Sequence, residues 1–214
     1  MGYSDKTYPP GNADLLQMFR EPQFDKEVAS RIIANIPDLN APIIDLDGYS
    51  STYLFEAQSS NNVDAVRFLL ENGADPNLDI PELLSSCALT DLHFLWSEME
   101  DDRAKRLEVA KLFFEFGGDP NLWYECETLY DHVLWEVSND DHTPHDWEYV
   151  CSFFKILIAY GGGGGRGSCP KPKLLEPIDK NRIDEYEFKL FLCKDRYHYE
   201  GHLFNPDGDD IGIV

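Results

Sequence analysis

Two histidines in the middle of this 214-residue chain are its best candidates for metal chemistry. His142 and His145 stand beside Asp140 and Asp141, and Cys151 follows nearby. Imidazole, carboxylate and thiolate are the groups that bind zinc in proteins. The segment SNDDHTPHD, however, has the composition of a polar inserted loop and lacks a zinc-ligand spacing. We therefore expect adventitious metal or none.

Two glycine-containing segments partly resemble ligand-binding loops, but each lacks a residue that such a loop needs. The run from Gly162 to Ser168 resembles a phosphate-binding loop in composition alone, since no lysine precedes the serine. Asp207, Asp209 and Gly212 resemble the start of a calcium loop, but Ile211 occupies a position that needs an oxygen ligand. We expect neither a nucleotide nor a calcium ion, and no other cofactor.

The sequence carries no recognisable catalytic motif. There is no G-x-S-x-G, no H-E-x-x-H and no evident cysteine–histidine nucleophile pair. His198 and His202 stand near carboxylates in a region of strand-like patterning. They leave open an enzyme with a site between the helical part and the C-terminal strands, but their spacing alone gives no reason to propose it. We expect a protein that is not an enzyme.

The elements that position these residues begin with the segment from Thr52 to Asn77. Its sequence, TYLFEAQSSNNVDAVRFLLENGADPN, predicts two helices closed by a glycine and an Asp-Pro-Asn turn. Glycine ends a helix readily because it adopts a left-handed conformation without a Cβ clash. Proline then prevents the helix from resuming, and the Asp and Asn side chains close local turns.

This unit is repeated along the chain. LFFEFGGDPN, residues 112–121, matches LLENGADPN, and Gly117 follows Gly73 by 117 − 73 = 44 residues. A weaker copy ends ILIAYGGG, and Gly161 lies 161 − 117 = 44 residues further on. IPDLN, residues 36–40, has the Asp-x-Asn ending without the glycine, which suggests a half-unit cap. Such a unit needs neighbours to bury its apolar face.

Each helix that precedes a glycine carries an apolar stripe with helical spacing. These residues are the predicted core: Val63, Val66, Leu69 and Leu70, then Leu107, Ala110, Phe113 and Phe114, then Val150, Phe153, Phe154, Leu157 and Ile158.

Thr52, Leu54 and Ala57, followed by Gly73-Ala74-Asp75-Pro76-Asn77, make this unit resemble the ankyrin repeat. Tyr53 stands where that family has proline, Phe55 where it has histidine, and Asn61-Asn62 where it usually has Gly-His. The family period is about 33 residues. Each 44-residue step therefore implies an insertion of roughly 11 residues, which we place around residues 96–106 and 138–147.

After Gly161 the composition changes. GGGGGRGSCPKPK, residues 161–173, is typical of a linker, and the patterning that follows is that of strands. Strands are predicted at residues 187–192, around 197–204 and at 211–214, with turns at residues 194–196 and 205–208. We expect a three-stranded antiparallel meander that packs on the last repeat as a cap. A partner-binding edge is the alternative.

The predicted fold is mainly α: an ankyrin-like helical repeat solenoid of about three to four units with a small C-terminal antiparallel β meander. The repeat domain covers residues 1–165, with an N-terminal helical cap at about 11–40 and repeats at about 41–78, 79–122 and 123–163. Residues 166–214 form a linker and a β-rich extension.

The chain is strongly acidic, with 18 basic and 40 acidic residues and a net charge of −22. Residues 1–165 hold 10 basic against 30 acidic residues, a net of −20. This balance disfavours nucleic acid and anionic membranes, and it favours either solubility alone or the steering of a basic partner.

No apolar run reaches the length of a membrane span, and residues 1–10 do not form a signal sequence. The five cysteines are widely spaced, so no disulfide framework is expected. We expect a cytoplasmic monomer.

The resemblance implies that partners are held by the turn that projects after each Asn and by the exposed face of each first helix. Carried onto this chain, the positions are Asp79, Glu82, Trp123, Tyr124, Glu125 and Glu127 in the turns, and Tyr53, Phe55, Glu56, Tyr130, Asp131 and Trp135 on the helices. Trp123 and Tyr124 are the strongest candidates, because rigid aromatic side chains dominate interface energies.

The sequence therefore predicts a non-enzymatic protein–protein interaction module with a basic protein partner. A narrower alternative is an immunity or inhibitor protein that neutralises a toxin or nuclease by presenting carboxylates in place of phosphates.

Overall fold

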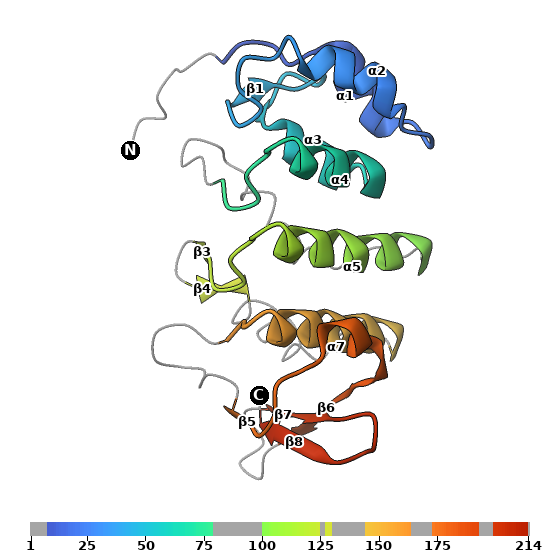
Figure 1. The fold of residues 1–214 in the computed structure, drawn as a ribbon, viewed down its shortest axis with the longest axis vertical. Helices are drawn as coiled ribbons and strands as arrows, with labels where there is room; N and C mark the ends of the chain where they lie inside the picture. The colour runs from blue at the N-terminus through green and yellow to red at the C-terminus, as the bar shows by residue number, and fades with distance from the viewer. Residues whose placement is uncertain are drawn as a thin grey trace. The chain divides into compact units, whose positions relative to one another are not determined.

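The computed structural model describes residues 8–78, 100–124, 127–129, 144–163, 173–192 and 199–213. The chain divides into two compact units, residues 1–92 with 99–118, and residues 93–98 with 119–214. The predicted boundary after residue 165 thus falls inside the second unit. Within the described residues the molecule is helical with a small antiparallel sheet (Figure 1).

The described elements follow one another in chain order within each unit. The first unit contains α1 (Ala13–Arg20), α2 (Lys26–Ile33), β1 (Ile43–Ile44), β2 (Ser50–Ser51), α3 (Tyr53–Ser59), α4 (Val63–Glu71) and α5 (Glu100–Glu115). The second contains β3 (Trp123–Tyr124), β4 (Glu127–Thr128), α7 (Pro144–Ala159), β5 (Lys173–Leu174), the 3₁₀ helix η2 (Lys180–Glu185), β6 (Glu187–Leu192), β7 (Tyr199–Phe204) and β8 (Asp210–Ile213).

Short polar residues start the first four helices. Asn12, Asp25, Thr52 and Asn62 precede α1, α2, α3 and α4, and each side chain accepts a hydrogen bond from a backbone N–H two or three residues later. These bonds satisfy amides that have no partner inside the helix. The turn between α3 and α4 passes through Asn61 at φ 51°, a left-handed conformation that asparagine tolerates better than most residues.

Three helices end in the same way, as the glycine pattern predicts. Gly73, Gly117 and Gly161 have φ values of 91°, 91° and 89°. In each case the following residue donates its N–H to the carbonyl five positions back: Ala74 to Leu69, Gly118 to Phe113 and Gly162 to Leu157. This is the Schellman arrangement, which satisfies carbonyls at the end of a helix.

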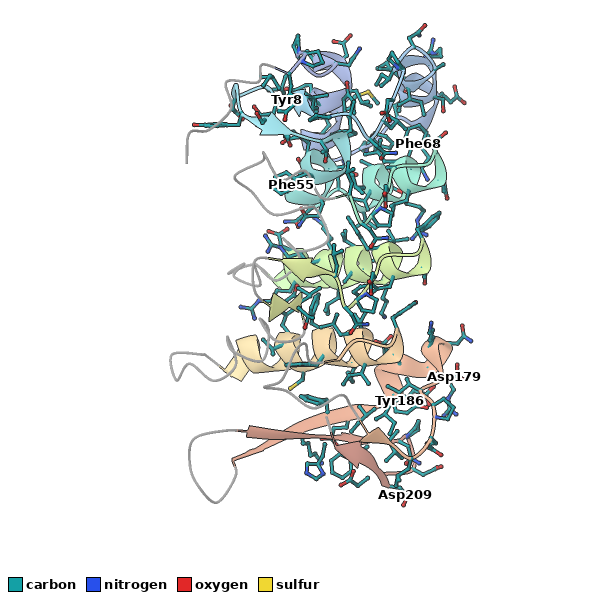
Figure 2. All side chains as sticks on the ribbon, turned by 90° about the vertical axis from the view of Figure 1, so that its left-hand side faces the viewer. Tyr8, Phe55, Phe68, Asp179, Tyr186 and Asp209 are labelled. Carbon is teal, nitrogen blue, oxygen red and sulfur yellow. The ribbon has the colours of Figure 1, made fainter. Side chains whose placement is uncertain are left out.

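The predicted apolar stripes lie in the interior. Val66, Leu69 and Leu70 of α4, Ala110, Phe113 and Phe114 of α5, and all five named residues of α7 are buried, whereas Val63 and Leu107 are half-buried. In the first unit, Phe24 links Phe19 of α1 to Phe68 of α4, with ring centroids 6.2 and 5.3 Å apart. Figure 2 shows Phe68 on α4.

Both predicted insertions are partly helical. Helix α5 begins at Glu100 and α7 at Pro144, so each is 16 residues long where α4 has 9. Residues 100–106 have the sequence EDDRAKR, in which Glu, Arg, Ala and Lys are good helix formers. Pro144 occupies the first helical position, where a missing N–H costs nothing. The expectation of a polar loop over SNDDHTPHD, residues 138–146, is therefore wrong from residue 144 onward.

The C-terminal sheet has the strand order β5-β8-β7-β6, with every pair antiparallel. Strands β6, β7 and β8 form the predicted meander. The predicted turn at residues 205–208 joins β7 to β8, with Gly208 at φ 87° and its N–H donated to the Asn205 carbonyl. Strand β5 is a fourth strand that the sequence does not predict, since residue 173 falls in the expected linker. The predicted turn at residues 194–196 lies outside the described residues.

One face of this sheet packs on α7 within the second unit. Phe188 of β6 stacks on Phe154 of α7 with ring centroids 5.1 Å apart, and Lys155 donates to the Tyr186 carbonyl at 2.9 Å. The cross-strand partner of Phe188, Leu203, is fully buried. The strands thus pack on α7, the helix of the last predicted repeat, and their role as its cap stays a prediction.

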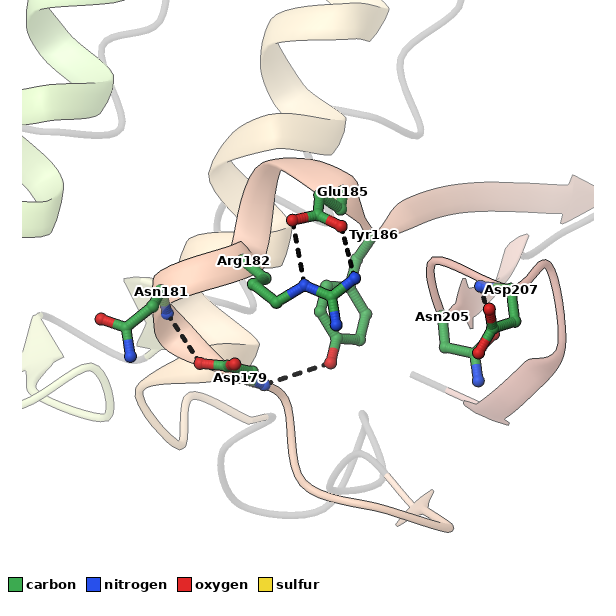
Figure 3. Close-up of polar contacts among 7 residues, drawn as sticks. All are labelled: Asp179, Asn181, Arg182, Glu185, Tyr186, Asn205 and Asp207. Carbon is green, nitrogen blue, oxygen red and sulfur yellow. Dashed lines mark hydrogen bonds and ion pairs between the residues drawn. The ribbon is translucent and has the colours of Figure 1, made fainter.

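The helix η2 lies between β5 and β6, two strands of the sheet. Figure 3 shows that Asp179 caps η2 by accepting from the Asn181 N–H, while its own N–H donates to the Tyr186 hydroxyl at 3.2 Å. Arg182 and Glu185 pair on the exposed side of the same turn. These local bonds fix the chain direction between the linker region and β6.

Candidate functional site

The Asp-x-Asn turns have the same geometry at three places. Asp38, Asp75 and Asp119 each accept, through Oδ1, a hydrogen bond of 2.9 Å from the N–H two residues later. The half-unit ending at residues 36–40 is therefore built like the two full endings, although it lacks the glycine. Pro76 and Pro120 are buried.

The asparagine that closes each turn binds the next helix end. Asn40 Nδ2 donates to the Gly73 carbonyl at 3.1 Å, Asn77 Nδ2 to the Gly117 carbonyl at 2.9 Å, and Asn121 Nδ2 to the Gly161 carbonyl at 3.0 Å. Each acceptor is the carbonyl of a glycine in the left-handed conformation. The repeat visible in the sequence is thus matched by a repeated tertiary bond.

Asn40 and Asn121 also accept through Oδ1. The N–H of Asp75 donates to Asn40 at 2.8 Å, and the N–H of Gly163 donates to Asn121 at 3.0 Å. Gly163 stands two residues after its glycine, as Asp75 does, so the third ending keeps this contact without the Asp-Pro-Asn sequence. Glycine can take the place of aspartate at this position, because the backbone N–H makes the bond and the side chain does not.

A short hairpin follows the turn at Asn121. Strands β3 and β4 pair in antiparallel register, Trp123 with Thr128 and Tyr124 with Glu127. The predicted binding residues Trp123, Tyr124 and Glu127 therefore lie on these two paired strands, and the structure describes only their backbone. Glu125 lies outside the described residues. Thr128 at the base is buried and donates to the Gly163 carbonyl at 3.4 Å.

The other predicted contact residues divide into two groups. Tyr53 is buried, with 4% of its surface exposed, and its hydroxyl accepts from the Asn12 N–H at 2.9 Å. This side chain therefore serves the packing of α3 rather than an exposed face. Phe55 and Glu56 are half-buried on α3, where Figure 2 labels Phe55. The remaining positions, which lie outside the described residues, are Asp79, Glu82, Tyr130, Asp131 and Trp135.

A second hairpin, which the sequence reasoning did not select, follows the turn at Asn40. Strands β1 and β2 pair Ile43 with Ser51 and Ile44 with Ser50. We call residues 45–49, which connect them, the hairpin tip. The tip exposes 72% of Tyr49 and 38% of Leu46. The available signal was the sequence DLDGY, whose Asp-Gly pair is typical of a tight turn between short strands.

The hairpin tip is held by its own first residue. Asp45 Oδ1 accepts from the N–H groups of Asp47 at 2.9 Å and Tyr49 at 2.7 Å, and the Asp45 N–H donates to the Tyr49 carbonyl at 2.8 Å. Gly48 takes φ 90° between them. These bonds fix the backbone on both sides of Leu46 and Tyr49.

Three carboxylates and one guanidinium surround the hairpin. Asp47 pairs with Arg20 of α1 at 2.7 Å, and Ser51 Oγ donates to Glu56 Oε1 at 2.6 Å. Burial raises the pKa of Glu56 above its usual value, while the Ser51 hydrogen bond opposes that shift. The nearby Asp45 also acts to raise the Glu56 pKa. The local charge is therefore negative when Glu56 is ionised.

The structure describes only some of the histidines that were considered for catalysis or metal binding. His202 Nδ1 lies 2.7 Å from Asp210 Oδ2 on the neighbouring strand, and this contact holds the pKa of Asp210 below its usual value. His198 and His142 lie outside the described residues, and only the backbone of His145 is described, within α7.

Cys151 is the candidate metal ligand whose side chain the structure describes. Burial raises the pKa of the Cys151 thiol to about 11, so this sulfur is protonated at neutral pH. Among the residues that the structure describes, no three His, Cys, Asp or Glu side chains gather as metal ligands would.

In the described part of the chain, no helix has both the length and the apolar character of a membrane span.

Two short hairpins, β1–β2 and β3–β4, therefore follow turns of the Asp-x-Asn type in the described residues. No protein-family model matches the chain, and no curated protein matches it in sequence.

Proposed function

We propose that the protein is a non-enzymatic binding module, an acidic ankyrin-like repeat protein that holds a basic protein partner through its projecting turns and concave face. The observation that carries this proposal is the recurrence of one turn and one asparagine bond at Asn40, Asn77 and Asn121. Two of these turns lead into a short hairpin in the described residues. A scaffold that repeats its anchors and projects short hairpins is suited to recognition.

The repeat geometry supports the ankyrin-like part of the proposal. Helices α3 and α4 pack as a pair, α4 packs on α5, and Arg67 of α4 pairs with Glu108 of α5 at 3.2 Å. The sequence Thr52 to Asn77, which carries the resemblance, includes the α3–α4 pair and its closing turn. Because each helix pair leaves one apolar side to be covered by the next, such units are stable only when stacked.

The charge supports a basic partner. The chain carries a net charge of −22, and residues 1–165 hold −20 of it. A surface of one sign raises the association rate of an oppositely charged partner, and the effect weakens as salt is added. This is also the property that an inhibitor of a basic toxin or nuclease would need, so the identity of the partner decides between the general module and the inhibitor.

The proposal is tested by capture followed by reconstitution. The full chain and the variants Trp123→Ala and Tyr124→Ala are used to capture partners from the native host, and proteins are identified by mass spectrometry. The main partner is then purified, and its affinity is measured by calorimetry across a range of salt concentrations. We expect a basic protein whose affinity falls with salt and falls at least about tenfold in one of the two variants.

Three results separate the possibilities. A toxin or nuclease as sole partner, inhibited on binding, favours the inhibitor. Binding that neither substitution weakens removes the β3–β4 hairpin from the proposal. Failure to bind any protein in purified form overturns the binding function altogether.

A further inference from the structure

We propose that the hairpin tip, residues 45–49, is a docking element for a segment of a partner protein that places a Lys or Arg next to an apolar side chain. This inference rests on the proposed binding function, and it assigns the contact to a surface other than Trp123 and Tyr124. Four features support it: the hairpin's base, the order of the tip, its exposure and its charge.

The base of the hairpin is anchored on both sides. Ile44 exchanges backbone hydrogen bonds with Pro9 and Gly11, from its N–H to the Pro9 carbonyl at 2.9 Å and from the Gly11 N–H to its carbonyl at 2.8 Å. Ile43 and Ser51 are buried. Since the strands cannot move without breaking these contacts, the tip has a fixed position on the first unit.

The tip itself is ordered without contributing to the core. Asp45 fixes the turn through two accepted hydrogen bonds, and nothing lies within 4 Å of the position where a Cβ on Gly48 would stand. Tyr49 is 72% exposed. A single exposed aromatic residue is common on protein surfaces. One held on a rigid turn costs little conformational entropy when it binds, which is how aromatic anchors gain affinity.

The charges around the tip select the occupant. Asp45, Asp47 and Glu56 are close enough to interact electrostatically with Arg20, so three carboxylates surround one guanidinium. The face of the Tyr49 ring attracts a cation, as aromatic faces do. Leu46, three residues from Tyr49 on the same tip, is 38% exposed and offers an apolar contact. In a partner segment, a Lys or Arg would pair with the carboxylates and lie over the Tyr49 ring, while the apolar residue beside it would pack on Leu46.

A second copy of this chain is a poorer occupant than a basic segment. Two molecules of net charge −22 repel one another. Arg20, whose guanidinium lies beside the tip, is already paired with Asp47. The same surface would therefore meet carboxylates on its partner, and like charges at an interface are costly.

The test uses the full ¹⁵N-labelled chain and three synthetic 12-residue peptides of matched length. The first alternates Lys and Arg with Leu, the second replaces Leu by Ser, and the third replaces the basic residues by Glu. We expect the first peptide to shift the amide signals of residues 45–49 most strongly, and the other two to bind at least about tenfold more weakly. Tyr49→Ala should weaken the first peptide at least about tenfold.

Leu175→Ala is the matched control, because Leu175 is another exposed apolar side chain at 84% exposure and lies in the second unit. We expect it to change the affinity less than twofold. Equal weakening by both substitutions, or equal binding of the first two peptides, overturns the inference.

The location of the response separates this inference from the proposed function. If the first peptide binds and shifts residues 122–128 instead, the binding function stands and the hairpin tip is not its site. If it binds at neither hairpin, the inference fails, and the capture experiment still decides the proposed function. Sedimentation that shows a dimer lost in Tyr49→Ala assigns the tip to self-association and also overturns the inference.

Discussion

The β1–β2 hairpin and the C-terminal sheet are two small β structures that treat their apolar residues in opposite ways. The sheet turns Phe188 and Leu203 toward the interior, where Phe188 stacks on α7. Its other face carries Glu187 and Lys189, which pair at 2.9 Å, and the His202–Asp210 contact. The hairpin instead buries its base and exposes Tyr49 at its tip.

This contrast in burial and polar pairing distinguishes a cap from a binding element. A cap covers an apolar helix face and shows solvent a polar surface whose groups satisfy one another. In the described strands the sheet has both properties, with Lys189 also lying 4.7 Å from the ring centroid of Phe204. The hairpin tip instead leaves Tyr49 and part of Leu46 in solvent, and its ion pair between Asp47 and Arg20 lies on the surface. We therefore expect the sheet to contribute to stability, and we propose recognition as the role of the hairpin.

The largest effect should come from removing the contact between the sheet and α7. Phe188→Ala deletes a buried ring that stacks on Phe154, and such truncations cost about 3–5 kcal/mol. We expect a lower urea midpoint and faster hydrogen exchange in α7 and β6. Phe188→Leu, which keeps most of the volume, is the control. If α7 exchanges at the wild-type rate in Phe188→Ala, the sheet is not a cap.

The next effect should come from the asparagine bonds. Asn121→Ala removes the side-chain partner of the Gly161 carbonyl and of the Gly163 N–H, at a cost of about 0.5–1.5 kcal/mol, because one bond is exposed and the other is only partly buried. Asn121→Asp keeps the acceptor for Gly163 and loses the donor to Gly161, so we expect an intermediate loss. Chemical denaturation measures both variants. Equal stability of Asn121→Ala and wild type would remove this bond from the account of the repeat.

A smaller effect concerns pH and the base of the hairpin. Because burial raises the folded-state pKa of Glu56, its contribution to stability is fully present below the unfolded pKa and is lost as pH rises through the folded value. Glu56→Gln keeps an acceptor for Ser51 without the charge. We expect this variant to be more stable than wild type at pH 7, by about 0.5 kcal/mol.

The expected gain of Glu56→Gln should disappear near pH 4, where the wild-type carboxyl is protonated. Thermal unfolding of both proteins between pH 4 and pH 8 measures the difference. A wild type that gains stability relative to the variant as pH rises would mean that the Ser51 hydrogen bond and Arg20 outweigh burial.

The smallest effect on stability should come from Tyr49→Ala, the counterpart of Phe188→Ala. Because Tyr49 is 72% exposed, we expect a change within about 0.5 kcal/mol by chemical denaturation. A loss as large as that of Phe188→Ala would show that the tip supports the fold, and the contrast between the two β structures would collapse.

Much of the fold was predictable because its signals are local. Glycines placed two residues after each helix, such as Gly73 and Gly161, end their helices through backbone conformation alone. The apolar stripes follow from helical period. The meander followed from alternation at residues 187–192 and from the Asn-Pro-Asp-Gly turn.

The parts that escaped prediction depend on distant contacts or on very short elements. Tyr53 has the position of an exposed helix residue, and only its bond to the Asn12 N–H, 41 residues away, shows why it is buried. Strands β1, β2 and β5 have two residues each, too few for an alternating pattern. The start of α5, EDDRAKR, carries no apolar stripe, so helical periodicity gives no signal for it, and the 44-residue step places it in an insertion.

The asparagine bond also sets a rule for changes in chain length. Asn40 and Gly73 are 33 residues apart, whereas Asn77 and Gly117 are 40 apart, yet the two bonds have nearly the same length at 3.1 and 2.9 Å. Seven additional residues between the anchors thus leave the junction unchanged. The stretch between one asparagine and the next glycine is therefore a natural place to graft foreign loops or to alter specificity without rebuilding the scaffold.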